Sequence, residues 1–97
     1  MKFEIKFVRS ADGDVASYDA HERRLILDGI GRYLEVDADV ETRRRKRLRP
    51  NPLAPWELRM GMYRVFYEIR DNSVVRVLAV GHKEHNDLYI RGRKVEL

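Results

Sequence analysis

Residues 56–89 read WELRMGMYRVFYEIRDNSVVRVLAVGHKEHNDLY, and this stretch decides the fold. Apolar and polar side chains alternate through three runs, WELRM, YRVFYEIR and SVVRVLAVGH. This two-residue period is typical of a strand that buries one face. Gly61 separates the first two runs and the Asp71-Asn72-Ser73 stretch separates the others, and such residues favour tight turns. The sequence therefore predicts an antiparallel meander of three strands.

The alternation also predicts two chemically different faces of the sheet. One face suits a core because its side chains are aromatic or aliphatic, namely Trp56, Leu58, Met60, Tyr63, Val65, Tyr67 and Ile69. The other face mixes charged and apolar groups, and we expect it to hold Glu57, Arg59, Arg64, Phe66, Glu68, Arg76, Leu78, Val80 and His82.

The residues before the meander predict one strand and one main helix. Phe3, Ile5 and Phe7 alternate with charged residues, which indicates an N-terminal strand. Asp19 followed by Glu22 favours a helix start, and one helical face would then carry Ala20, Ile26, Leu27, Ile30, Tyr33 and Leu34. Residues 10–17 contain Gly13 and two aspartates, so we expect a loop with at most one helical turn.

The final residues, LYIRGRKVEL, alternate around Arg91-Gly92 and predict a closing hairpin. A chain of 97 residues has room for a single domain, here residues 1–97. Without cysteine the chain can form no disulfide, and its three histidines lack zinc-site spacing, so we expect neither a metal nor a cofactor. The opening MKFEIKF is not followed by an apolar run, so we expect a cytoplasmic protein without signal peptide or membrane contact.

Positive charge gathers in the second half of the chain. Residues 1–42 carry 6 basic and 10 acidic side chains, whereas residues 43–97 carry 14 and 6. Such asymmetry favours a polyanionic partner, because clustered cations release counterions from nucleic-acid phosphates. A solvated surface is the alternative interpretation. The densest basic segment lies between Val36 and Pro55, where prolines favour an extended arm at the edge of the sheet.

The string WELRMGMYRVFYEI, followed by a hairpin and VLAVGHKEHNDLY, resembles the carboxyl-terminal half of the RelE/ParE toxin superfamily. The order of the elements agrees as well, so the resemblance extends over nearly the whole chain. It implies an α+β fold in which a small antiparallel sheet, the meander plus the N-terminal strand, packs one face on one or two helices. It also implies a toxin–antitoxin pair, with an antitoxin encoded by an adjacent gene.

Many members of this superfamily cleave messenger RNA on the ribosome without a metal, and others poison DNA gyrase. Metal-free RNA cleavage needs a base for the 2′-hydroxyl, a cation for the phosphate and an acid for the leaving oxygen. The resemblance assigns the phosphate to Arg64, whose alternative is a surface ion pair with Glu57 or Glu68. Lys83 stands where the family often has a second arginine.

Two further residues are candidates for proton transfer or base stacking. His82 suits acid or base work because imidazole titrates near neutrality, although a structural hydrogen bond is an alternative role. Tyr89 matches a family tyrosine that stacks a base or moves a proton, and its alternative role is to close the core.

The chain departs from the messenger-cleaving branch on the first meander strand. Pro55 and Glu57 occupy the positions of two lysines. Glu57 would serve as a carboxylate base or would neutralise Arg59 or Arg64. The missing charge could come from the arm, so the predicted RNA-binding residues are Arg43, Arg44, Arg45, Lys46, Arg47, Arg49, Arg59 and Arg76. The arm could equally contact DNA or an acidic antitoxin.

With the resemblance, these residues imply a ribosome-associated endoribonuclease that cleaves messenger RNA and inhibits translation. A gyrase inhibitor without enzymatic activity is the first alternative, favoured by Pro55 and Glu57. The second alternative is a catalytically silent module of the same fold, which would bind the antitoxin and reach operator DNA through that complex.

Overall fold

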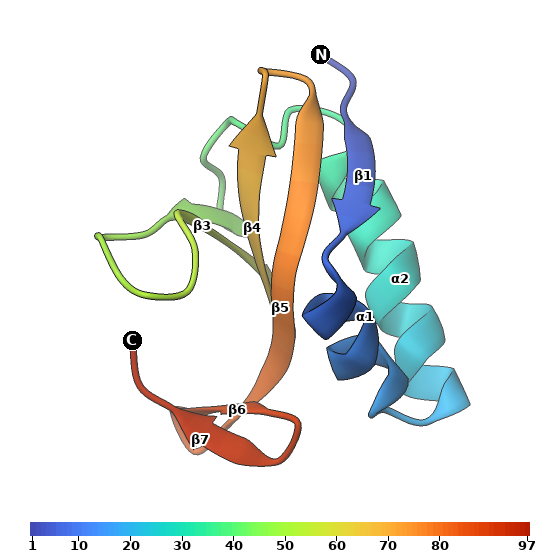
Figure 1. Cartoon of the computed structure of the whole chain (residues 1–97), viewed down its shortest axis with the longest axis vertical. Coiled ribbons are helices and arrows are strands. Elements are labelled where there is room, and N and C mark those ends of the chain that lie inside the picture. Colours follow the sequence, from blue (N-terminus) through green and yellow to red (C-terminus); the bar gives the residue numbers. More distant parts are fainter.

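The computed structural model describes residues 1–97 and shows two helices on one face of a seven-stranded sheet (Figure 1). The predicted α+β architecture is confirmed. Neither helix is long and apolar enough to span a membrane. The elements in chain order are β1 (Glu4–Phe7), α1 (Arg9–Ala16), α2 (Ala20–Leu34), β2 (Arg45–Arg47), β3 (Trp56–Met60), β4 (Tyr63–Arg70), β5 (Val74–Glu84), β6 (Asp87–Ile90) and β7 (Arg93–Val95).

The strands follow the order β2-β3-β4-β5-β6-β7, and each neighbouring pair is antiparallel. The predicted meander and closing hairpin are therefore confirmed. β1 lies beside the first half of β5 and is parallel to it, with Glu4 opposite Val74 and Phe7 opposite Val77. β6 pairs with the far end of the same strand, from His82 to Glu84. The middle of β5 consequently has no strand on that side.

Helix α2 begins as predicted, because the Asp19 carboxylate accepts a hydrogen bond from the Glu22 backbone N–H at 2.8 Å. Its buried stripe is narrower than predicted and consists of Ile26, Ile30 and Leu34. These three residues are four positions apart and form a single row on the helix. Leu27 lies outside this row and is 46% exposed, so its predicted burial is wrong.

Helix α1 corrects the prediction of a loop at residues 10–17. It spans Arg9–Ala16 and no side chain caps its start. Asp12, Gly13 and Asp14 are weak helix formers, which is why the sequence did not indicate it. Tertiary contacts override that propensity because Ala11 and Val15 are buried in the main core, 0% and 6% exposed.

The two glycines of α2 differ in their surroundings. A methyl group on Gly29 would overlap the sulfur of Met60, so the close packing that the sequence left open exists there. At Gly31 a methyl group would meet only a Glu35 carboxylate oxygen, at 3.9 Å.

We therefore expect Gly31→Ala to stabilise the protein by about 0.5–1 kcal/mol, because alanine restricts the unfolded chain and favours helix. The thermal midpoint should rise by roughly 3–6 °C. Gly29→Ala is the matched comparison and should gain less, since Met60 must move. An equal rise for both variants would contradict the packing at Gly29.

The main core lies between the sheet and the helices. Its sheet side contains the predicted residues Trp56, Leu58, Val65 and Tyr67, and Met60, Tyr63 and Ile69 pack against them. The fully buried Tyr67 donates its hydroxyl hydrogen bond to the Ala38 carbonyl at 2.8 Å, so this polar atom is satisfied within the core. The parity of β3 and β4 is thus confirmed.

A β-bulge shifts the parity of β5. Phe66 of β4 lies opposite Ala79, but the next residue, Tyr67, lies opposite Val77, so Leu78 is the additional residue. Beyond the bulge, the predicted faces are exchanged. Val80 belongs to the main core on the helix side. His82 likewise lies opposite Tyr63 on that side, so the predicted shared face of His82 and Arg64 is wrong.

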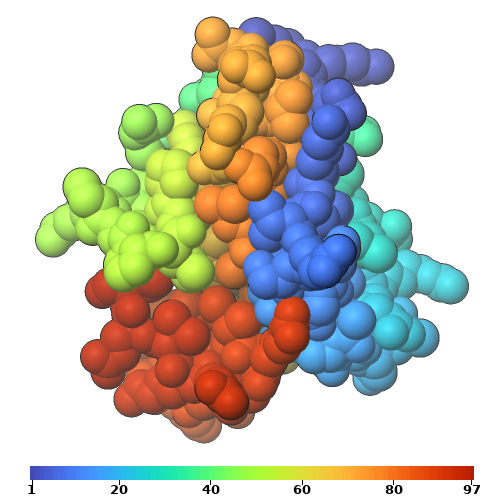
Figure 2. Space-filling model, viewed as in Figure 1, coloured from blue at the N-terminus to red at the C-terminus, as the bar shows by residue number.

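A second, smaller core covers the other face of the sheet. It contains Ala54, Phe66, Ala79 and Leu88, and Leu48, Leu53, Leu78, Ile90 and Val95 pack against it. These residues come from the loop between β2 and β3, from the sheet and from the β6–β7 hairpin. Figure 2 shows the yellow-green loop and the red hairpin side by side next to the orange β5. The face predicted to mix charged and apolar groups is therefore partly covered.

Candidate functional site

Part of the basic arm forms β2, an edge strand of the sheet, which is where the sequence predicted the arm to lie. β2 pairs with β3, with Arg45 opposite Leu58 and Arg47 opposite Trp56. The Arg45 guanidinium donates hydrogen bonds to the carbonyls of Val40 and Tyr33, both at 2.9 Å. Arg45 is therefore occupied in fixing the arm, which removes it from the surface cations.

Two other arginines of the arm stack on aromatic rings. The Arg44 guanidinium lies 4.6 Å from the Tyr33 ring centroid, and that of Arg47 lies 5.5 Å from the Trp56 ring. Both side chains remain exposed, as do Arg43 and Arg49. Stacking leaves the guanidinium edges free to donate hydrogen bonds, so these residues form a positively charged edge beside the sheet.

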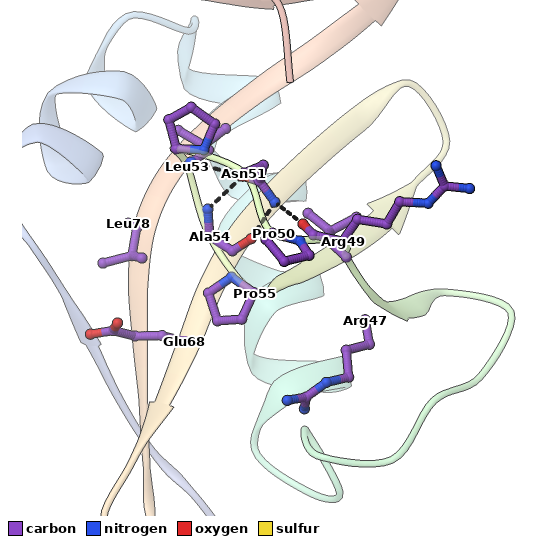
Figure 3. A pocket seen from close by; sticks show the side chains of 11 residues that line it. Arg47, Arg49, Pro50, Asn51, Leu53, Ala54, Pro55, Glu68 and Leu78 are labelled. Atoms are coloured by element: carbon purple, nitrogen blue, oxygen red, sulfur yellow. Dashed lines mark hydrogen bonds between the residues drawn. The ribbon is translucent and has the colours of Figure 1, made fainter.

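Asn51 organises the proline-rich loop that follows the arm. Its side chain donates to the carbonyls of Arg49 and Ala54, at 2.7 and 2.8 Å, and accepts from the N–H groups of Leu53 and Ala54, at 2.7 and 3.0 Å. The loop borders a pocket of about 540 Å³, with Leu78 and Glu68 on its strand side (Figure 3). Since Asn51 uses its polar groups on the backbone, the loop is a rigid cover over the sheet.

Most charged residues on the side of the sheet that carries the second core are paired with one another. Glu57 is 4% exposed and accepts a hydrogen bond from Arg59 Nε at 2.6 Å. Glu68 accepts from Arg76 Nη1 at 2.8 Å and from Arg70 Nε at 2.9 Å. Glu57 thus makes the ion pair of its neutralising alternative, and its carboxylate is almost fully buried.

Arg64 and Lys83 are the cations of this region without a carboxylate partner. Arg64 Nη1 donates to the carbonyls of Gly61 and Tyr63, at 2.6 and 2.9 Å, and its Nε is buried without a partner. Burial lowers the pKa of the Arg64 guanidinium, and Glu57 opposes this effect. Lys83 Nζ reaches only the Asn86 carbonyl, at 3.4 Å. Both charges are therefore available to an anion.

His82 makes contacts that the sequence did not predict. Its Nδ1 lies 2.6 Å from the Tyr18 hydroxyl and its Nε2 lies 2.8 Å from a Glu84 carboxylate oxygen. The rings of His82 and Tyr89 stack, with 5.9 Å between their centroids and 21° between their planes. Tyr89 lies opposite His82 in the β5–β6 pair, so both belong to the helix side of the sheet.

Four of the five predicted catalytic residues, Arg64, His82, Lys83 and Tyr89, thus meet at one end of the sheet and not on one face. Arg64 and Lys83 point to the side of the second core, since their strand partners there are Gly81 and Leu88. His82 and Tyr89 point to the helix side. The backbone connects both groups, because Lys83 N–H donates to the Met62 carbonyl in the β3–β4 turn at 2.8 Å.

Sequence reasoning missed Tyr18 and Glu84. Glu84 could have been found from the sequence, because it follows His82 by two residues on a strand and such residues point to the same face. No sequence signal points to Tyr18, since it lies 64 residues before its partner His82.

The comparisons with known proteins agree with this architecture. Residues 26–87 match the family described as "ParE toxin of type II toxin-antitoxin system, parDE". A chain of the toxin–antitoxin complex RelBE2 from Mycobacterium tuberculosis superposes with a TM-score of 0.73 at 23% identity, over 86% of this chain and 100% of that chain. A search of curated proteins found no significant match.

The fold and the matched residues together define a protein of the RelE/ParE superfamily. The family match spans more than half of the chain, so the chain belongs to the ParE toxin family of type II toxin–antitoxin systems.

Proposed function

We propose that this toxin is a metal-free endoribonuclease that cleaves messenger RNA on the ribosome and so inhibits translation. The observation that carries the proposal is the end of the sheet, where two cations without carboxylate partners lie on one side and a hydrogen-bonded imidazole lies on the other. Arg64 and Lys83 supply positive charge for a scissile phosphate. His82 supplies an imidazole that can accept or donate a proton.

The exposed arginines of the arm would bind the RNA backbone. Arg43, Arg44, Arg47 and Arg49 are exposed cations along one edge, and phosphate contacts of this kind position a nucleic acid without reading its sequence. Arg59 and Arg76 are paired with Glu57 and Glu68, so we expect them to contribute less. We further propose that the toxin acts in the cytoplasm and that a cognate antitoxin from an adjacent gene, with its operator complex, restrains it.

Induced expression without the antitoxin gene tests the proposal. We expect translation to stop and new RNA 5′ ends to map within translated messages, whereas co-expression of the neighbouring gene should restore growth. Intact transcripts together with continuing protein synthesis would exclude a ribonuclease. If expression without the neighbour leaves growth unaffected, the chain is the silent antitoxin-binding or DNA-binding module.

A gyrase inhibitor is the second candidate, and two observations favour it. The matched family is described by its ParE toxin, and Pro55 and Glu57 replace the lysines of the messenger-cleaving branch. This candidate predicts that purified protein inhibits DNA supercoiling by gyrase while RNA stays intact. Full supercoiling activity at saturating toxin would exclude it.

A further inference from the structure

Tyr18, His82 and Glu84 form a continuous hydrogen-bonded row at the end of the sheet. Tyr18 lies in the connection between α1 and α2, and the other two lie on β5. The Tyr18 hydroxyl is 2.6 Å from His82 Nδ1, and His82 Nε2 is 2.8 Å from Glu84 Oε2. Carboxylate, imidazole and hydroxyl thus follow one another in the order that activates a hydroxyl in many enzymes.

The chemistry of the groups sets the direction of both hydrogen bonds. An ionised carboxylate only accepts, so His82 Nε2 carries a hydrogen and donates a hydrogen bond to Glu84. In the neutral imidazole, Nδ1 is then the acceptor, and it receives the hydroxyl hydrogen of Tyr18. Burial, and after it the carboxylate of Glu22, raises the pKa of Tyr18 to about 12, so this hydroxyl keeps its proton at neutral pH.

Packing holds the row in place from both sides. The Tyr18 ring meets the Tyr63 ring edge to face, with centroids 5.8 Å apart and planes at 88°. The Tyr89 ring stacks on the His82 ring, and the His82 side chain is 17% exposed. After burial, the carboxylates that raise the pKa of Tyr18 are Glu22 of α2, Asp14 of α1 and Glu84 of β5. Position and orientation are therefore fixed before a substrate arrives.

Fold stability alone does not account for Glu84. Its side chain is 57% exposed, and an exposed ion pair contributes little to stability. Its contact does fix the His82 ring and its tautomer, which is the task of the orienting carboxylate in such rows.

We propose that Glu84, His82 and Tyr18 form a proton relay whose reactive end is the Tyr18 hydroxyl, and that its substrate is the 2′-hydroxyl of RNA. This inference rests on the proposed ribonuclease function. Tyr18 is the catalytic residue that touches the substrate, whereas Glu84 is a positioning residue.

The relay would move protons as the RNA backbone is cleaved. The 2′ O–H bond breaks as its proton moves to the Tyr18 oxygen, while the phenolic proton of Tyr18 moves to His82 Nδ1. The freed electron pair of the 2′-oxygen forms a bond to phosphorus, and the bond from phosphorus to the 5′-oxygen breaks. The leaving 5′-oxygen takes a proton from water, and the imidazolium, held by Glu84, later returns its extra proton to solvent. The products are a 2′,3′-cyclic phosphate and a 5′-hydroxyl.

The first test reads the tautomer of His82 by ¹⁵N NMR of the purified toxin. We expect the Nε2–H form to dominate in the wild type, and Glu84→Gln should shift the population. His21 and His85 are exposed and serve as internal references in the same spectra. A tautomer mixture at His82 equal to that of these two histidines would overturn the relay whatever the toxin cleaves.

The second test measures cleavage rates on ribosomes programmed with a defined message. Tyr18→Phe should lower the rate about 10- to 100-fold, with a thermal midpoint close to that of the wild type. Glu84→Gln should lower it less, and the double variant should equal Tyr18→Phe. A single 2′-deoxy nucleotide at the scissile position should abolish cleavage.

The outcomes separate the two proposals. If the wild type cleaves and both variants match its rate, the relay is wrong and the ribonuclease remains. If the wild type cleaves no message, the ribonuclease is wrong, and the RNA substrate of the relay falls with it.

Discussion

Replacing Arg64 by alanine is expected to lower the rate of message cleavage about 10²- to 10³-fold, because a fixed cation then no longer stabilises the phosphate in the transition state. Arg64 is suited to this task because it has no carboxylate partner, whereas the neighbouring Arg59 is bound to Glu57. Rates on programmed ribosomes and growth after induction both measure the effect.

The change should leave the fold intact. Arg64 donates to the carbonyls of Gly61 and Tyr63 in the exposed β3–β4 turn, and water can replace these donors, so the loss of stability is about 1 kcal/mol. Urea unfolding checks this value.

Two further variants sharpen the result. Arg64→Lys keeps the charge and loses the planar fork, so its rate should lie between wild type and alanine. Arg70→Ala is the matched control, because Arg70 is on the same strand and is paired with Glu68 at 2.9 Å. Undiminished toxicity of Arg64→Ala would remove Arg64 from the mechanism. Loss of toxicity in Arg70→Ala as well would indicate a general charge effect.

The strands were predictable because their pattern is local. Apolar and polar residues largely alternate within Trp56–Met60 and Tyr63–Arg70. Each tight turn of the meander contains a residue type that tolerates positive φ, namely Gly61 at 59° and Asn72 at 55°. Neither feature depends on distant contacts, so β3, β4 and most of β5 followed from the sequence.

The position of His82 could not be predicted in the same way. The bulge at Leu78 adds one residue to β5 and moves every later side chain to the opposite face. Leu78 itself has no feature that marks a bulge, because it continues the apolar run. The candidate residues therefore lie at one end of the sheet, but the prediction that they share one face is wrong.

Contacts between distant residues account for the other differences. Tyr18 meets His82 across 64 positions, and Asp14 meets Arg91 across 77. In a sequence, Asp14 next to Gly13 indicates a loop. In the structure it is a buried carboxylate within a helix, and its partners come from the other end of the chain.

Replacing Asp14 by alanine is expected to lower the free energy of unfolding by about 3–5 kcal/mol, because it leaves buried polar groups without partners. Asp14 is 4% exposed. Its Oδ2 accepts from the Val80 N–H at 3.0 Å, and its Oδ1 accepts from Arg91 Nε at 2.8 Å. Val80 lies on the stretch of β5 that has no neighbouring strand on that side, so the carboxylate replaces a strand partner there.

The partner Arg91 provides an independent check of this contact. Its Nη2 also donates to the Ser10 carbonyl at 2.7 Å, and its guanidinium occupies the space that a methyl group on Gly13 would need. Gly13→Ala should therefore displace Arg91. Its loss of unfolding free energy should equal that of Arg91→Ala, and both losses should be smaller than that of Asp14→Ala. The double variant should lose little more than either single variant, because both changes remove the same contact.

Asp12→Ala is the matched control, since Asp12 is an exposed aspartate of the same helix. Its loss should stay below about 1 kcal/mol, the range of a charge near a helix start. Urea unfolding followed by circular dichroism gives all of these values from the midpoint and slope. If Asp14→Ala were no less stable than Asp12→Ala, the carboxylate would not hold β5, and α1 would be held against the sheet by Ala11 and Val15 in the main core instead.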